Sequence, residues 1–274
     1  MPDVQALDLT GWVAIIEKIA GDLHQGNITA TDLNAEYIEK SGKELHKAID
    51  EGFGSNFNKA DEKLLSSLKE NAWVFSAAKN LAMQKEMAEL IVDENGQIRS
   101  FNAFKQDVLK INENYNKTYL QAEYQTALSS SQSARKWNDI QRRKKRFPNL
   151  KYRTVGDENV REEHQALDGT IRPVDHPFWD TYYPPNGWRC RCFVTQTDVE
   201  PNGEDVPTID DKTVPEDFRM NVGKNGQSFK VSENTNDKTF MAYGGTTPLL
   251  SNNAKKLIAT QFAKIKKAMD EKSK

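Results

Sequence analysis

The sequence predicts an α+β protein, in which a mainly helical N-terminal region precedes a compact, loop-rich module with short strands and a C-terminal helix. The distribution of proline is the first reason: Pro2 is the only proline before Pro148, and the other nine lie between Pro148 and Pro248. Because proline interrupts both helices and sheet ladders, long helices fit only the first half of the chain. The second reason is that apolar residues recur at helical spacing throughout that half.

The first half contains four stretches of helical periodicity. Apolar residues three or four positions apart predict helices over residues 9–23, 33–38, 64–91 and 100–140. Thr29 and Asp32 are expected to cap the second helix, and turns are expected at 52–54 and 93–96. The serine run 129–131 is expected to weaken or break the fourth helix.

The later sequence is divided into short pieces by Pro, Gly, Asn and Asp. Apolar or aromatic segments at Arg191–Gln196 and Ser228–Val231 are the strand candidates. A lysine-rich C-terminal helix, with Ile258, Phe262, Ile265 and Met269 along one stripe, is expected to meet a partner helix rather than a membrane surface. The predicted domains are residues 1–147, 148–245 and 246–274.

Composition excludes several classes of protein. The 274 residues carry 38 basic and 40 acidic side chains, a net charge of −2, and the mean hydropathy is −0.77. No apolar run approaches the length of a membrane span, and the start of the chain shows no secretory signal. Two cysteines cannot form a disulfide scaffold, so a reducing compartment is expected. Phosphate-cradling and dinucleotide-binding glycine motifs are absent.

Cysteine and histidine residues form the densest group of chemically capable side chains. His164, His176, Cys190 and Cys192 are the candidate ligands of a zinc ion, because two thiolates and two imidazoles can complete a tetrahedron. If residues 189–193 are extended, both cysteines lie on one face of the strand. The alternative is a buried, uncoordinated thiol pair that behaves as two small apolar residues, with the histidines hydrogen-bonded in loops.

Positive charge is concentrated at the end of the predicted long helix. Residues 135–146 contain seven cations against Asp139 alone, an excess of six: Arg135, Lys136, Arg142, Arg143, Lys144, Lys145 and Arg146. We call these seven residues the basic cluster. It predicts contact with nucleic-acid phosphates or with a partner protein through Arg142–Arg146. The alternative is a set of solvated cations that complement the helix dipole.

A third pattern lies ahead of the cysteines. Arg161, His164 and Asp168 are spaced to share one side of a short helix, with Arg161 paired to Asp168 or Asp175. A rival interpretation is a metal-dependent nuclease or toxin-like enzyme that uses His164, Asp168, Asp175 and His176. No histidine follows position 176 to complete such a nuclease motif, so we expect no enzymatic activity and name no catalytic residue.

Three blocks of sequence together resemble the phage Mu F-like head morphogenesis (minor capsid) family. The blocks are Phe147-Pro148-x-Leu150-Lys151-Tyr152-Arg153-Thr154, then Asp157-Glu158-x-Val160-Arg161-x-x-His164-x-x-Leu167-Asp168-Gly169, and Pro184-Pro185-x-x-Trp188-x-Cys190-Arg191-Cys192. We therefore interpret Arg161, Asp168 and Gly169 as structural motif residues. Family members often carry a histidine shortly before Cys-Arg-Cys, where this chain has Gly187-Trp188, which leaves His176 as the substitute ligand.

The resemblance implies a minor head protein that acts in head morphogenesis through the portal, scaffold or major capsid protein, with DNA as a further contact. It also implies a location in the virion head interior, and in the host cytoplasm during assembly. The family brings no established catalytic residues.

Overall fold

The computed structural model describes residues 10–55, 58–203 and 213–230, and the predicted C-terminal helix over 246–274 lies outside them. The described part is helical up to Arg143 and mixed afterwards, which confirms the predicted α+β class, with a helical region before a mixed part. None of the described helices is long and apolar enough to cross a membrane.

The helices before residue 144 are α1 (Trp12–His24), α2 (Ala35–Phe53), α3 (Lys59–Glu89), α4 (Phe101–Glu113) and α5 (Leu120–Arg143). A π-helical segment, Asn114–Tyr119, joins α4 to α5. The mixed part contains β1 (Asn149–Arg153), α6 (Glu162–Gln165), β2 (Ile171–Pro173), α7 (Phe178–Thr181), β3 (Phe193–Thr197), the 3-10 turn Glu216–Phe218 and α8 (Val222–Asn225).

The chain divides into two compact units. The described part of the first, the helical unit, lies within Met1–His46 and Ala72–Tyr124. The second, the mixed unit, comprises Lys47–Asn71 and Gln125–Val231. The predicted boundary at residue 147 marks a change in secondary structure, whereas these units divide α2 and α3 and end near the start of α5. The domain boundaries therefore stay a prediction.

The helical unit is held together by interdigitated aromatic and aliphatic side chains. Trp73, Ala77 and Leu81 of α3 pack against Ile38 of α2 in one buried cluster. Trp12 of α1 meets Tyr37 edge to face, with ring centroids 5.2 Å apart. Whereas α1 buries one apolar face, as its periodicity predicts, α3 is buried on most sides between Asn71 and Gln84.

Two predictions about the helices are wrong in instructive ways. The cap of α2 is Asn34, whose Oδ1 accepts the Tyr37 N–H at 2.8 Å, while Thr29 and Asp32 close a separate turn before it. The serine run does not break α5, because the Ser129 and Ser131 hydroxyls donate to the carbonyls of Thr126 and Leu128 within the same helix. These two hydroxyls thereby stay satisfied inside the helix, whereas the buried Ser130 hydroxyl has no hydrogen-bond partner among the described residues.

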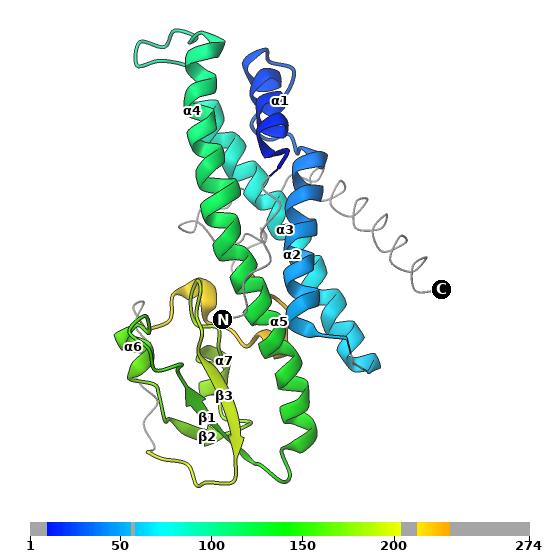
Figure 1. The fold of residues 1–274 in the computed structure, drawn as a ribbon, viewed down its shortest axis with the longest axis vertical. Coiled ribbons are helices and arrows are strands. Elements are labelled where there is room, and N and C mark those ends of the chain that lie inside the picture. Colours follow the sequence, from blue (N-terminus) through cyan, green and yellow to red (C-terminus); the bar gives the residue numbers. More distant parts are fainter. Residues whose placement is uncertain (1–9, 56–57, 204–212, 231–274) are drawn as a thin grey trace. The chain divides into compact units, whose positions relative to one another are not determined.

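A three-stranded antiparallel sheet of order β2-β1-β3 organises the mixed unit (Figure 1). Leu150 of β1 pairs with Arg172 of β2 and with Gln196 of β3. The strand candidate Arg191–Gln196 overlaps β3, which confirms that element, although β3 begins two residues later, at Phe193.

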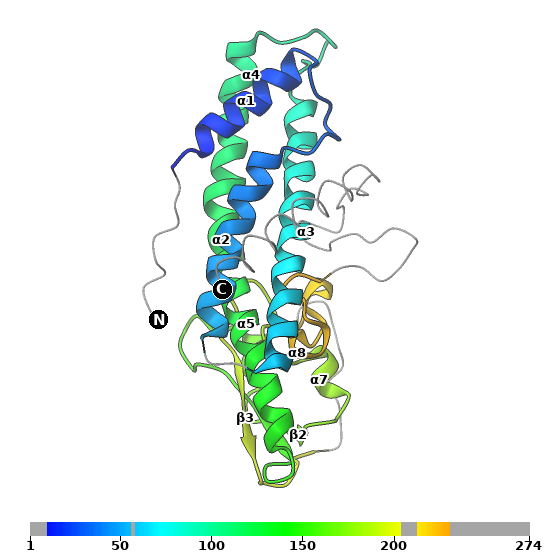
Figure 2. The ribbon, with the colours of Figure 1, turned by 90° about the vertical axis from the view of Figure 1, so that its right-hand side faces the viewer.

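The second strand candidate, Ser228–Val231, is not a strand over its described residues. The Asn71 side chain takes the place of a neighbouring strand there. Its Oδ1 accepts the N–H groups of Ser228 and Phe229, and its Nδ2 donates to the Phe229 carbonyl. Nearby, α8 lies beside α7 (Figure 2), where Asn221 Nδ2 donates to the Trp179 carbonyl at 3.1 Å.

Candidate functional site

Three of the four predicted metal ligands lie together in the mixed unit. His164 Nδ1 is 3.8 Å from Cys190 Sγ and 3.7 Å from Cys192 Sγ, and the three atoms all lie within 4.8 Å of one another. His164 and Cys190 are buried and Cys192 is half-buried. Both cysteines are free thiols. We call these three residues the thiol–imidazole cluster.

Two short segments bring the cluster together. His164 lies on α6, and the cysteines come from the turn that leads into β3. Arg189 in that turn has a φ of 59°, and the Cys190 N–H donates to the Gly187 carbonyl at 3.1 Å. Arg189 itself is therefore not extended, because its left-handed backbone turns the chain before the strand starts at Phe193. Both cysteines nevertheless face the same side chain, His164.

The fourth predicted ligand, His176, lies elsewhere. Its Nδ1 accepts the N–H of Phe178 at 3.1 Å and closes the turn that starts α7. Among the described residues, the group of close ligand atoms contains His164, Cys190 and Cys192 and not His176. The sequence could not separate these cases, because both histidines are close to the cysteines along the chain.

The pKa values of the two thiols shift in opposite directions because the thiols are hydrogen-bonded to each other. Hydrogen bonding from Cys192, followed by that from His164, holds the pKa of Cys190 well below its ordinary value, although burial opposes this. The same contact with Cys190, together with burial, raises the pKa of Cys192. The Nε2 atom of His164 has no hydrogen-bond partner among the described residues, so Nδ1 is the nitrogen that faces the sulfurs.

The predicted pairing of Arg161 with Asp168 or Asp175 is wrong. Because α6 spans only four residues, Arg161 precedes the helix, and its Nη2 donates to the Trp188 carbonyl at 2.9 Å. Asp168 instead accepts the Thr154 N–H at 2.8 Å. Gly169, the last residue of the predicted motif, has a φ of 85° and donates its N–H to the Tyr152 carbonyl, so its position favours glycine.

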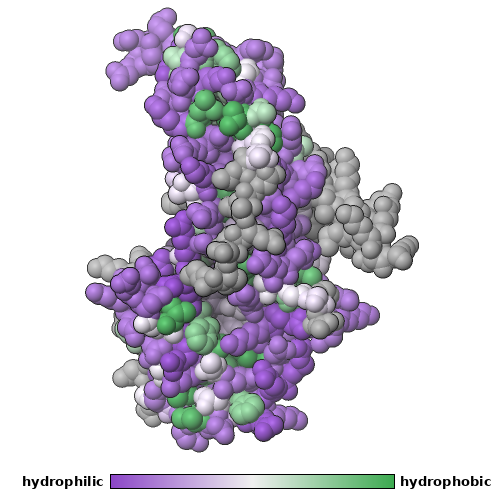
Figure 3. Space-filling model, in the orientation of Figure 1, coloured by the Kyte–Doolittle hydropathy of each residue, from purple (hydrophilic) through white to green (hydrophobic). Residues whose placement is uncertain are grey.

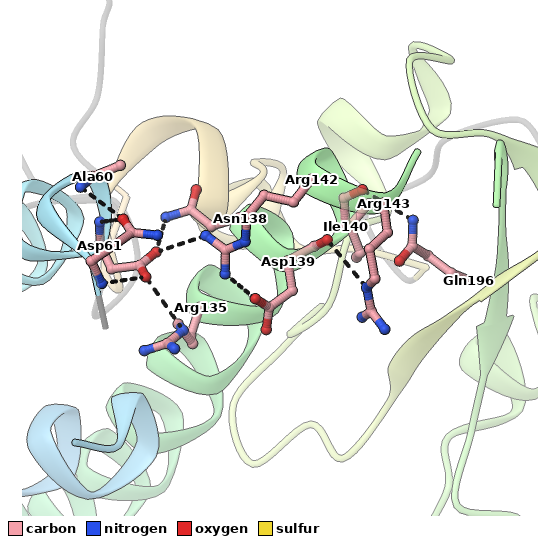
Figure 4. Close-up of polar contacts among 10 residues, drawn as sticks. Ala60, Asp61, Arg135, Asn138, Asp139, Ile140, Arg142, Arg143 and Gln196 are labelled. Atoms are coloured by element: carbon pink, nitrogen blue, oxygen red, sulfur yellow. Dashed lines mark hydrogen bonds and ion pairs between the residues drawn. The ribbon is translucent and has the colours of Figure 1, made fainter. Parts of the chain in front are cut away.

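The basic cluster is also part of the mixed unit, and acidic residues from distant segments neutralise part of it. Asp61 of α3 is buried and accepts Asn138 Nδ2 at 2.7 Å. Its oxygens lie 3.8 Å from Arg135 Nε and 3.7 Å from Arg142 Nη1, and Asp139 also binds Arg142 (Figure 4). Lys144 binds both oxygens of Asp175, at 3.1 and 3.0 Å. With Asp61 and Asp175 counted, the local excess of positive charge falls from six to four.

The remaining cations have no such partner. Among the described residues, no carboxylate lies within ion-pair distance of Lys136, Arg143, Lys145 or Arg146. Arg143, Lys145 and Arg146 are exposed. Burial, and then the charge of Arg143, lower the pKa of Lys136. A concentrated positive charge therefore persists where α5 ends.

Comparison with known proteins places these features in a family. Residues 43–195, more than half of the chain, match the family described as Phage Mu protein F like protein. The chain belongs to this family. The matched range contains the basic cluster, His164, Cys190 and Cys192.

Two curated relatives cover only short parts of the chain. "Mu-like prophage FluMu F protein" of Haemophilus influenzae is 35% identical over 92 residues, which are 28% of this chain and 22% of the relative. "Putative capsid assembly protein F" of Escherichia phage Mu is 46% identical over 48 residues, which are 18% of this chain and 11% of the relative. No solved structure matches the chain significantly.

Asp61 is the residue of this Mu F-like chain that sequence reasoning missed. The sequence pattern around it, Asn58 followed three residues later by Asp61, indicates only a helix N-cap. In the structure, Asn58 Oδ1 accepts the Asp61 N–H, and Asp61 Oδ2 accepts the Asn58 N–H. Such a reciprocal pair marks a helix start. Nothing in that local pattern shows that the same carboxylate also meets two arginines more than 70 residues later.

Proposed function

We propose that this protein is a minor head protein of a tailed phage or prophage, and that it acts in head assembly through contacts rather than catalysis. Membership of the Mu F-like family is the observation that carries the proposal. The printed name of the phage Mu relative, which refers to capsid assembly, agrees with it. The chain covers 22% and 11% of its two relatives, so the role of the whole relatives is carried over here as a proposal.

The basic cluster is the proposed contact surface. Arg143, Lys145 and Arg146 are exposed and have no carboxylate partner among the described residues. Figure 3 shows that hydrophilic side chains cover most of the described surface on one face of the molecule, as expected for a protein whose contacts are polar. Portal proteins, capsid proteins and packaged DNA are the partners proposed for such a surface, in the virion head and during assembly in the host cytoplasm.

The nuclease alternative finds less support in the arrangement of its residues. Asp168 accepts a backbone N–H in the β1 region, and Asp175 binds Lys144. Among the described residues, these two carboxylates do not join His164 in a group of potential metal ligands. A zinc-loaded preparation that cleaves DNA, with activity lost in His164→Gln, would favour the nuclease over the head protein.

Co-purification tests the proposed role. The full chain is co-expressed with the portal and major capsid proteins of the same genome, and head particles and soluble complexes are separated by sedimentation. We expect the protein to sediment with the portal or the heads. An Arg143→Gln/Lys145→Gln/Arg146→Gln variant should weaken that association, whereas Arg142→Gln/Lys144→Gln should change it less. Sedimentation of the protein alone, with normal heads formed without it, would refute the proposal.

A further inference from the structure

The proposed head role leaves the thiol–imidazole cluster without a purpose. Its three side chains converge from two segments, α6 and the turn before β3, separated by 26 residues along the chain. The hydrogen bonds among these side chains are weak, because a thiol is a weak donor and its sulfur a weak acceptor. The arrangement calls for a specific occupant.

The distances match a tetrahedral zinc site. Zinc bonds of about 2.3 Å to sulfur and about 2.0 Å to nitrogen place sulfur and nitrogen about 3.6 Å apart across the edge of a tetrahedron. The observed distances from His164 Nδ1 are 3.8 Å to Cys190 Sγ and 3.7 Å to Cys192 Sγ. The two nitrogen–sulfur distances therefore need to shorten by only one or two tenths of an ångström to hold a zinc ion, and all three ligand atoms lie within 4.8 Å of one another.

Contacts around the cluster hold its segments in place without the metal. Arg161, just before α6, donates to the Trp188 carbonyl in the cysteine turn. Arg191, between the cysteines, binds Asp157 ahead of α6. Both arginines tie the histidine segment to the cysteine segment, so the ligands are preorganised rather than gathered from a flexible chain.

We propose that His164 Nδ1, Cys190 Sγ and Cys192 Sγ bind one zinc ion, and that water takes the fourth position. Each thiol releases its proton to solvent on binding, and the imidazole binds as the neutral base. Two thiolates cancel the charge of the ion, so a largely buried site carries no net charge. Soft thiolate ligands favour zinc over magnesium or calcium, which prefer oxygen.

Metal analysis of the full chain tests the proposal. The tag-free protein is equilibrated with zinc, dialysed and measured by mass spectrometry of the elements, and a parallel sample is loaded with cobalt. We expect about one zinc per chain and, with cobalt, the thiolate charge-transfer band and intense visible bands of a tetrahedral site. Both thiols should react with a disulfide reagent only after chelation.

Matched variants locate the site. Cys190→Ser, Cys192→Ser and His164→Gln should each lose most of the bound metal, whereas His176→Gln should keep it, because His176 lies outside the cluster. Where a cysteine variant fails to fold, the cobalt spectrum and thiol protection of the wild type carry the test. Metal-free wild-type protein with freely reactive thiols would overturn the proposal, as would loss of zinc in His176→Gln alone. Because these measurements do not involve head assembly, they can fail independently of the proposed function.

Discussion

One buried polar cluster in each compact unit shows how differently the two units are built. In the helical unit, Lys79 of α3 and Glu123 of α5 are both buried, and Lys79 Nζ lies 2.6 Å from Glu123 Oε2. In the mixed unit, the buried cluster consists of an imidazole and two thiols, with no opposite charge among its members. The first set contains its own counter-ion, whereas the second is neutral as two thiols and an imidazole, and the zinc ion proposed above would bind there only on release of both thiol protons. The difference predicts which unit depends on the solution around it.

The largest effect is expected from breaking the pair in the helical unit. Burial lowers the pKa of Lys79 and raises that of Glu123, and each charge opposes the shift in the other. Lys79→Met leaves a buried carboxylate without its counter-charge, which should cost about 3–5 kcal/mol of unfolding free energy. Urea unfolding followed by circular dichroism measures the loss.

The double variant Lys79→Met/Glu123→Leu sharpens this prediction. Replacing both charges by apolar groups of similar size removes the uncompensated carboxylate, so most of the lost stability should return. If the double variant is as unstable as Lys79→Met, the lost stability does not come from an unpaired charge, and the contrast between the two units fails.

Removing metal should affect the mixed unit next most strongly. If the thiol–imidazole cluster binds zinc, free zinc at about 100 to 1,000 times its dissociation constant stabilises the fold by about 3–4 kcal/mol, which chelation removes. Tryptophan fluorescence reports the change, because Trp188 lies two residues before Cys190. Chelation should leave the stability of Cys190→Ser unchanged, and an equal response in that variant would contradict a site at this cluster.

The sequence predicts the features that depend on neighbouring residues, but not those that depend on residues distant along the chain. Helical periodicity located α1, α3, α4 and α5 because each depends on neighbours a few residues away. The Cys-Arg-Cys motif indicated the metal candidates, yet their true geometry depends on Arg189, whose left-handed backbone no local pattern predicts. Asn71 and Asp61 act on segments far along the chain, so their roles follow from the tertiary fold alone.

Acid should weaken the network around Asp61. Burial raises the pKa of this carboxyl, but the hydrogen bonds from Asn138 and from the Asn58 N–H, and the charges of Arg135 and Arg142, outweigh burial and hold the pKa below its ordinary value. A lowered pKa contributes stability above the unfolded-state value of about 3.9, and the contribution is lost as the pH falls through the folded-state pKa.

The variant Asp61→Asn tests this sign. It should lose about 1–3 kcal/mol of unfolding free energy at neutral pH, because hydrogen bonds to a charged group are removed. Thermal unfolding at pH 7 and at pH 3 measures the gap in melting temperature between the wild type and the variant. That gap should narrow in acid, and a gap that widens in acid would show that the carboxylate is not the stabilising form.

The smallest effect on stability is expected from the exposed cations at the end of α5 in the mixed unit. Arg143→Gln/Lys145→Gln/Arg146→Gln should change unfolding free energy by less than about 0.5 kcal/mol, because exposed charges contribute little. The variant should instead change binding. If the cluster meets DNA, its three exposed cations without carboxylate partners give a log–log salt slope of about −2.7 on duplex DNA, against about −4.5 for all five residues of Arg142–Arg146.

Filter binding of duplex DNA across a salt series separates these cases. The triple variant should flatten the slope almost completely, whereas Arg142→Gln/Lys144→Gln should keep most of it, because Asp61, Asp139 and Asp175 already engage those two cations. A slope near −4.5 would mean that DNA displaces the carboxylates, since ion pairs on a protein surface are weak enough to exchange. A third outcome is that the wild type does not bind DNA even at low salt, while the triple variant loses its association with the portal. The end of α5 would then be a protein-docking surface, because acidic side chains of a partner can pair with the same three cations as phosphates would.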